Sequence, residues 1–98
     1  MASDVGERAV ELLDKLLAER PEKVGPDFSE ATRCITTYRD GLIGQFRAGT
    51  VSRTELDGIN GVLSVVLAGH FPLGAVPWDK IATAREKLAA LVKSGASR

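Results

Sequence analysis

The sequence is poor in the residues that usually build catalytic and metal sites. It has one cysteine, Cys34, and one histidine, His70. With a single cysteine no disulfide can form within the chain, and we expect a reducing compartment, the cytoplasm. A metal site would need carboxylates or Cys34 close to His70, and nucleophilic catalysis would need a third orienting group; no residue spacing indicates either. We therefore predict no catalytic residues, no metal and no cofactor.

The chain also lacks an excess of charge of either sign. Its 13 basic and 13 acidic residues cancel to a net charge of zero. A domain that binds nucleic acid normally carries a basic face, so we expect no nucleic-acid partner. The segment Met1 to Gly6 is polar and acidic rather than basic and then apolar, so no signal peptide is expected.

One long segment lacks charge altogether. From Gly58 to Trp78 there is no acidic or basic residue apart from His70, although 27% of the chain is charged. The segment is long enough to span a bilayer, at about 20 residues, but its four glycines, Pro72 and Pro77 argue against a continuous membrane helix. We expect a soluble helix followed by an apolar connector, with no membrane partner.

Apolar side chains recur at three- and four-residue steps, and no strand-like alternation is present. This pattern predicts a single all-α domain over residues 1–98, with helices at about residues 4–20, 28–48, 53–69 and 78–93. Capping boxes are expected where the second and third helices begin, at Asp27–Glu30 and Ser52–Glu55. The short turn near Thr50 predicts a hairpin. We expect a small four-helix bundle or an orthogonal four-helix domain with a central helical hairpin.

Two features of the hairpin need a physical reason. Gly41 and Gly44 in the second helix, and Gly58 and Gly61 in the third, each cost about 1 kcal/mol relative to alanine in a helix. We predict that they let the two backbones approach closely; the alternative is that Gly41 or Gly58 marks a kink or the end of a shorter helix. The third helix is apolar around most of its circumference, which predicts a central position in the fold.

Two segments resemble known motifs. Residues 46–56 are similar to the turn of a helix-turn-helix DNA reader, but Thr50 and Glu55 are polar where that motif buries apolar side chains. Residues 12–20 resemble the first helix of small helical chorismate mutases, an all-α enzyme class of about this length. Pro21 ends the helix where that family's helix continues, so no active-site residue is carried over.

The connector from His70 to Trp78 concentrates aromatic and apolar side chains without charge. It either folds back over the bundle or presents an exposed apolar patch, the usual mark of a protein interface. We predict a small helical protein-interaction or regulatory module that self-associates as a homodimer or binds another protein. Its contact surface would be the third helix and the connector, through His70, Phe71, Leu73, Val76 and Trp78.

The alternative function is a small-molecule-binding or enzymatic bundle with an internal pocket. Its polar lining would come from neighbouring helices, through Cys34, Tyr38, Asn60 and His70. Asn60 lies in an apolar helix, and a buried amide would need a hydrogen-bonding partner.

Overall fold

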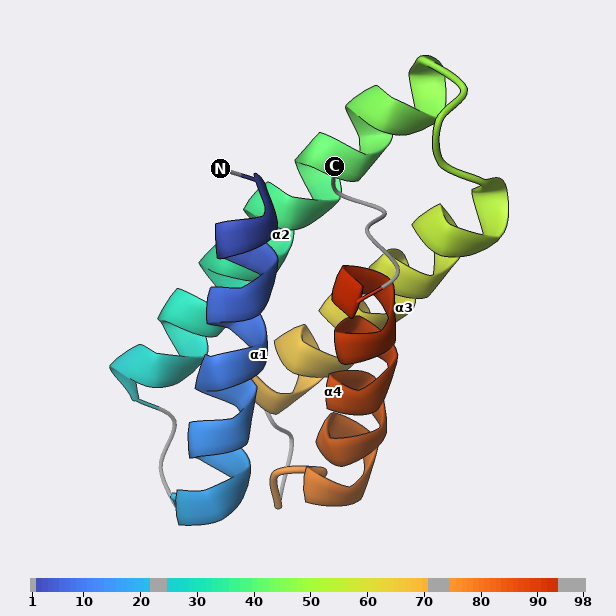
Figure 1. The fold of residues 1–98 in the computed structure, drawn as a ribbon. Coiled ribbons are helices and arrows are strands. Elements are labelled where there is room, and N and C mark those ends of the chain that lie inside the picture. The colour runs from blue at the N-terminus through green and yellow to red at the C-terminus, as the bar shows by residue number, and fades with distance from the viewer. Residues whose placement is uncertain (1, 22–24, 71–74, 94–98) are drawn as a thin grey trace.

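The computed structural model describes residues 2–21, 25–70 and 75–93, and these residues form four α-helices with no strand (Figure 1). In chain order they are α1 (Ala2–Glu19), α2 (Pro26–Arg47), α3 (Arg53–His70) and α4 (Trp78–Lys93). The predicted all-α class is confirmed. None of these helices, over the residues described, combines the length and apolarity needed to cross a bilayer.

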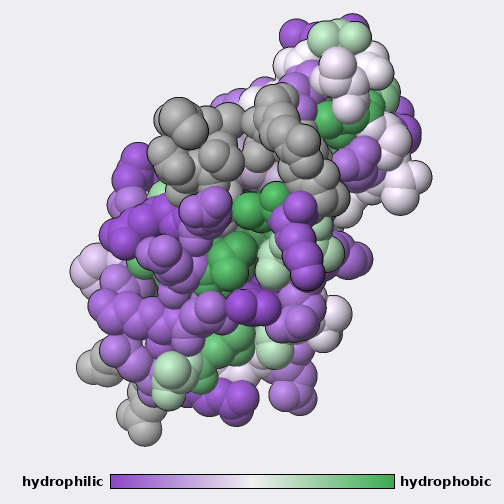
Figure 2. All heavy atoms as spheres, in the orientation of Figure 1, coloured by the Kyte–Doolittle hydropathy of each residue, from purple (hydrophilic) through white to green (hydrophobic). Residues whose placement is uncertain are grey.

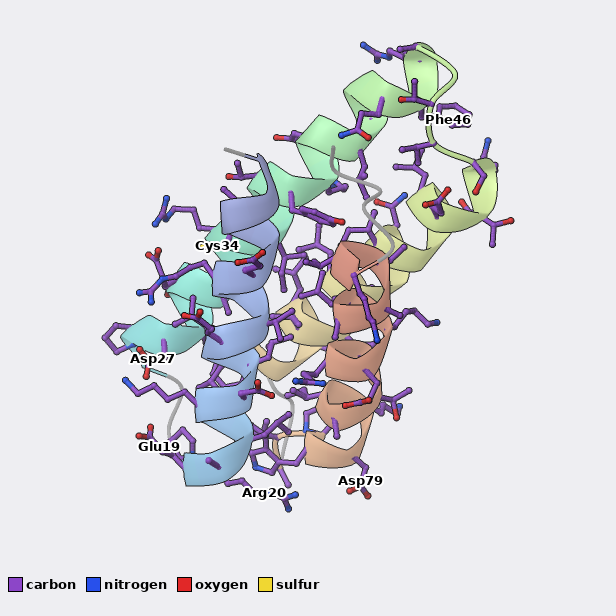
Figure 3. The ribbon with its side chains drawn as sticks, in the orientation of Figure 1. Glu19, Arg20, Asp27, Cys34, Phe46 and Asp79 are labelled. Atoms are coloured by element: carbon purple, nitrogen blue, oxygen red, sulfur yellow. The ribbon has the colours of Figure 1, made fainter. Side chains whose placement is uncertain are left out.

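Each helix packs against two others. Helix α1 packs along α2 and α4, and α3 packs along the same two helices, whereas the described backbones of the diagonal pairs α1/α3 and α2/α4 stay apart. This ring of contacts is consistent with a four-helix bundle. The molecule is elongated, at 41 × 22 × 18 Å, because the hairpin of α2 and α3 extends past the ends of α1 and α4 (Figure 1). Phe46 lies at that extended end and is labelled in Figure 3.

The hairpin turn is fixed by local hydrogen bonds. After α2, the N–H of Gly49 donates to the carbonyl of Phe46 and the N–H of Thr50 donates to that of Gln45, the Schellman pattern. Gly49 has a φ of 82°, which only glycine adopts without strain. The predicted capping box at the start of α3 is confirmed: the Glu55 N–H donates to Ser52 Oγ and the Ser52 N–H donates to Glu55 Oε1.

The predicted start of α2 is wrong in detail. The helix begins at Pro26, whose fixed φ suits the first helical position, and Gly25 before it makes no side-chain cap. The capping box at Asp27 does not form, because Asp27 already lies in the first turn of the helix rather than before it. Its carboxylate pairs with Lys15 Nζ of α1 at 3.2 Å, and Glu30 pairs with Arg33.

The core receives apolar side chains from all four helices. The burial of these side chains holds the four helices together. The largest fully buried members are Leu13, Leu16, Phe28, Ile35, Leu42, Ile59, Val62, Val66, Ile81 and Leu88. Burying one such side chain contributes about 1.5–3 kcal/mol. The exposed large hydrophobic residue among those described is Leu67, on α3, at 39% of its full accessibility.

The predicted role of the hairpin glycines is wrong. A Cβ added at Gly41, Gly44 or Gly61 would meet no atom within 4 Å, and one added at Gly58 would meet only Leu91 of α4, at 3.7 Å. They therefore do not bring α2 and α3 together. The alternative that Gly41 or Gly58 ends a helix is also wrong, since α2 and α3 continue through them.

Close approach of helices occurs at two other glycines. A Cβ at Gly6 would lie 2.7 Å from Val92 and 2.9 Å from Tyr38. A Cβ at Gly69 would lie 2.8 Å from Ile81 and 3.0 Å from Phe28. At these points α1 and α3 each pack closely against both neighbouring helices.

Candidate interaction surface

Helix α3 is not buried on all sides, so its predicted central position is wrong. It occupies one corner of the ring, with one side in the core and the opposite side in solvent. Beyond Asp57 the solvent side has no charged residue among the side chains described. Its members are Asn60, Gly61, Ser64, Leu67 and Ala68. Most of them are small or uncharged polar residues, which is why the helix tolerates exposure without an ionic face.

The connector lies partly outside the described residues. Phe71 and Leu73 are among the residues left undescribed, as is the side chain of His70. Val76 and Trp78 are half-buried and pack against the core. The indole ring of Trp78 lies 5.9 Å from the Phe28 ring, centroid to centroid, with the ring planes tilted by 40°. Only part of each of these two side chains therefore faces solvent.

The four residues of the predicted internal pocket are not brought together. Cys34 and Tyr38 are buried one turn apart on α2, whereas Asn60 is exposed on α3. An exposed amide is hydrated by solvent and needs no internal partner, so the argument for a polar cavity around Asn60 fails. The fourth residue, His70, has no described side chain.

Cys34 is held in an environment that suppresses its reactivity. Burial raises the pKa of the thiol, and the Glu30 carboxylate raises it further, with the Sγ–H donating to Oε1 at 3.7 Å. A neutral thiol is a weak nucleophile and a weak metal ligand. Within the described residues, no group of three or more His, Cys, Asp or Glu side chains is placed to hold a metal ion.

A groove runs along the surface between α3 and α4. It consists of two hollows of about 420 and 670 Å³ that share Lys87. The apolar part of their lining is Gly58, Gly61, Val62, Val65, Ala84, Ala90 and Leu91, and the polar part is Thr54, Glu55, Asp57, Asp79, Lys80, Thr83 and Lys87. The two glycines leave α3 without side chains at these points, which opens the groove between the helices.

The ends of the groove differ in charge. At the end near the hairpin turn, Glu55 is held by its cap with Ser52, and Asp57 pairs with Arg53 at 3.1 Å. On the α4 side, Lys80 and Lys87 are exposed, and neither forms an ion pair with any residue that the structure describes. The free positive charge of the groove therefore lies along α4.

A second, smaller groove lies between α1 and α4. Figure 2 shows apolar surface in the seam between these two helices, with hydrophilic surface on both sides. The groove has a volume of about 290 Å³ and is lined by Val10, Ala89 and Val92, with charges of both signs from Glu7, Glu11 and Lys93. The seam below it is closed by Arg85 of α4, which binds both carboxylate oxygens of Asp14 at 2.6 and 3.2 Å. This contact joins α1 to α4.

Lys80 and Lys87 were not among the site residues predicted from sequence, although their seven-residue spacing places them on one face of a helix. Comparison of the chain with protein-family models, with curated proteins and with solved structures finds no match in any of the three. The surface between α3 and α4 is therefore characterised by its own geometry alone.

Proposed function

We propose that this chain is a helical protein-interaction module that binds through the solvent side of α3 and the adjacent groove between α3 and α4. The observation that supports this is the combination of an uncharged helix face, which includes the exposed Leu67, with an apolar groove beside it. Apolar surface that is concentrated in one place is typical of protein interfaces.

The proposal differs from the prediction made from sequence in where the contact lies. The described end of the connector, Val76 and Trp78, is half-buried against the core, so the proposal keeps α3 as a contact surface and replaces the connector with α4. In this proposal the second helix of the α2–α3 hairpin carries the binding face. The single free cysteine supports a cytoplasmic setting.

The test uses two matched glycine substitutions. Gly61 and Gly44 both lie in helices and both have open space where a side chain would begin, but only Gly61 lines the groove. Leucine at Gly61 fills the groove, whereas leucine at Gly44 leaves it unchanged. Light scattering from micromolar to millimolar concentration measures self-association, and affinity capture followed by titration of each purified captured protein measures binding to other partners.

We expect Gly61→Leu to weaken the association at least tenfold and Gly44→Leu to leave it unchanged. A dimer that dissociates only in Gly61→Leu would show that a second copy is the partner. If both variants associate as the wild type does, or if no association is found in either assay, the proposed surface is wrong.

A further inference from the structure

The length of the groove matches a short helix. On α3 it extends from Thr54 to Val65, which at 1.5 Å per residue is about 16 Å, or three helical turns. Its floor is apolar: Val62, Val65, Ala84 and Leu91 supply aliphatic side chains, and Gly61 supplies open space. An open groove of this shape suits an amphipathic helix that lays its apolar side chains along the floor.

The charge on the α4 side adds a requirement. Lys80 and Lys87 are two turns apart on one face of α4, about 10 Å along the axis. Asp79, beside Lys80, lies in the first turn of α4, where it interacts favourably with the free N–H groups of the helix. Glu55 and Asp57, at the other end, already have partners in Ser52, just before α3, and Arg53, its first residue. A ligand that places carboxylates beside the two lysines would complete the ion pairing of the groove.

We infer that the groove binds an amphipathic helix of another protein, with acidic side chains two turns apart on the edge that faces α4. This inference rests on the proposed function. A second copy of this chain is a poor donor of such a helix, because each of its four helices already contributes its apolar side chains to its own core. The ligand helix is acidic beside Lys80 and Lys87 and neutral or basic beside Asp57.

The test is a selection from a displayed library of 14-residue amphipathic helices. Their apolar positions are fixed at helical spacing and their flanking positions are randomised among Glu, Lys, Gln and Ser. Binders to the wild-type protein are counter-selected against Gly61→Leu, so that only peptides that need the open groove remain. The net-charge effect is controlled by comparing Lys80→Glu/Lys87→Glu with Arg8→Glu/Arg47→Glu, because Arg8 and Arg47 are exposed cations outside the groove.

We expect the groove-dependent peptides to be enriched in Glu at two positions seven residues apart on one edge. Their affinity should fall at least tenfold in Lys80→Glu/Lys87→Glu and less than threefold in Arg8→Glu/Arg47→Glu, and it should fall with increasing salt. Groove-dependent peptides without acidic enrichment, or an equal loss in both double variants, would overturn the acidic-helix inference and leave the proposed surface intact. A selection that yields no groove-dependent peptide overturns the acidic-helix inference. The proposed function fails on a different result, namely that the wild-type protein shows no association that Gly61→Leu weakens.

Discussion

The packing of α1 between α2 and α4 makes Gly6 the most informative position for a stability measurement. A Cβ at this buried glycine would lie 2.7 Å from Val92 Cγ2 and 2.9 Å from Tyr38 Cε1. The end of the Val92 side chain can rotate away, but the Tyr38 ring is buried against the core and cannot. The Gly6→Ala substitution must therefore shift α1 or the ring.

The magnitude follows from two opposing effects. Alanine is favoured over glycine in a helix by at most about 1 kcal/mol. Overpacking a close-packed site costs about 1–3 kcal/mol. We expect Gly6→Ala to lose about 1 kcal/mol of unfolding free energy overall. At Gly41, where a Cβ meets no atom within 4 Å, only the first effect acts, and Gly41→Ala should gain about 0.5–1 kcal/mol.

Urea unfolding followed by circular dichroism at 222 nm measures both variants. The urea midpoint of Gly6→Ala should lie below that of the wild type and the midpoint of Gly41→Ala above it, with equal m-values. In a domain of this size, a change of about 1 kcal/mol in unfolding free energy corresponds to a shift of about 4–8 °C in melting temperature. Gly69→Ala and Gly61→Ala repeat the comparison within α3, with the same signs. If Gly6→Ala is as stable as Gly41→Ala, the close approach of α1 to α2 and α4 is wrong.

Three further predictions concern single contacts. Ser52→Ala removes the cap of α3 and should lower the unfolding free energy by about 1 kcal/mol in the same urea assay. Ser52→Asp should restore most of that stability. A Ser52→Ala variant as stable as the wild type would contradict the capping box. A double-mutant cycle on Asp14→Ala and Arg85→Ala should give a coupling of about 0.2–1 kcal/mol that decreases in high salt, because the pair is partly exposed; zero coupling at low salt would show that the pair does not join the helices. Because burial raises the pKa of Cys34, its labelling by a thiol reagent at pH 8 should be at least tenfold slower in the native protein than in urea, and equal rates would place the thiol at the surface.

Helix number and most helix ends could be predicted because they depend on local chemistry. The Ser52 capping box and the Gly49 terminus need only residues within one turn of each other, so their signals are present in the sequence. The start of α2 was predicted two residues too late because Asp27 was taken as the cap, whereas Pro26 already occupies the first helical position and Asp27 lies in the first turn. The ion pair between Asp27 and Lys15 of α1 could not be predicted, because it depends on how α1 packs on α2.

The candidate surface could be predicted only in part. The absence of charge after Asp57 directed attention to α3, but it did not show which side of the helix faces solvent. Asn60 was placed in a pocket and is exposed, because an uncharged helix face does not have to be buried when its residues are small. The groove and its lysines require the register of α3 against α4, which no pattern within a single helix specifies.

The glycines of α3 connect stability with the proposed binding. Gly41 and Gly44 have open space around them, and nothing in the structure explains their presence. Gly58 and Gly61 also forgo the stability that alanine would give, but they line the groove. Residues that lower stability and shape a binding surface are common where function requires them. Gly61→Ala should therefore stabilise the fold by about 0.5–1 kcal/mol and weaken helix binding at the same time, whereas Gly44→Ala should only stabilise. A Gly61→Ala variant that gains stability and keeps full affinity would show that the groove floor is not part of the binding site.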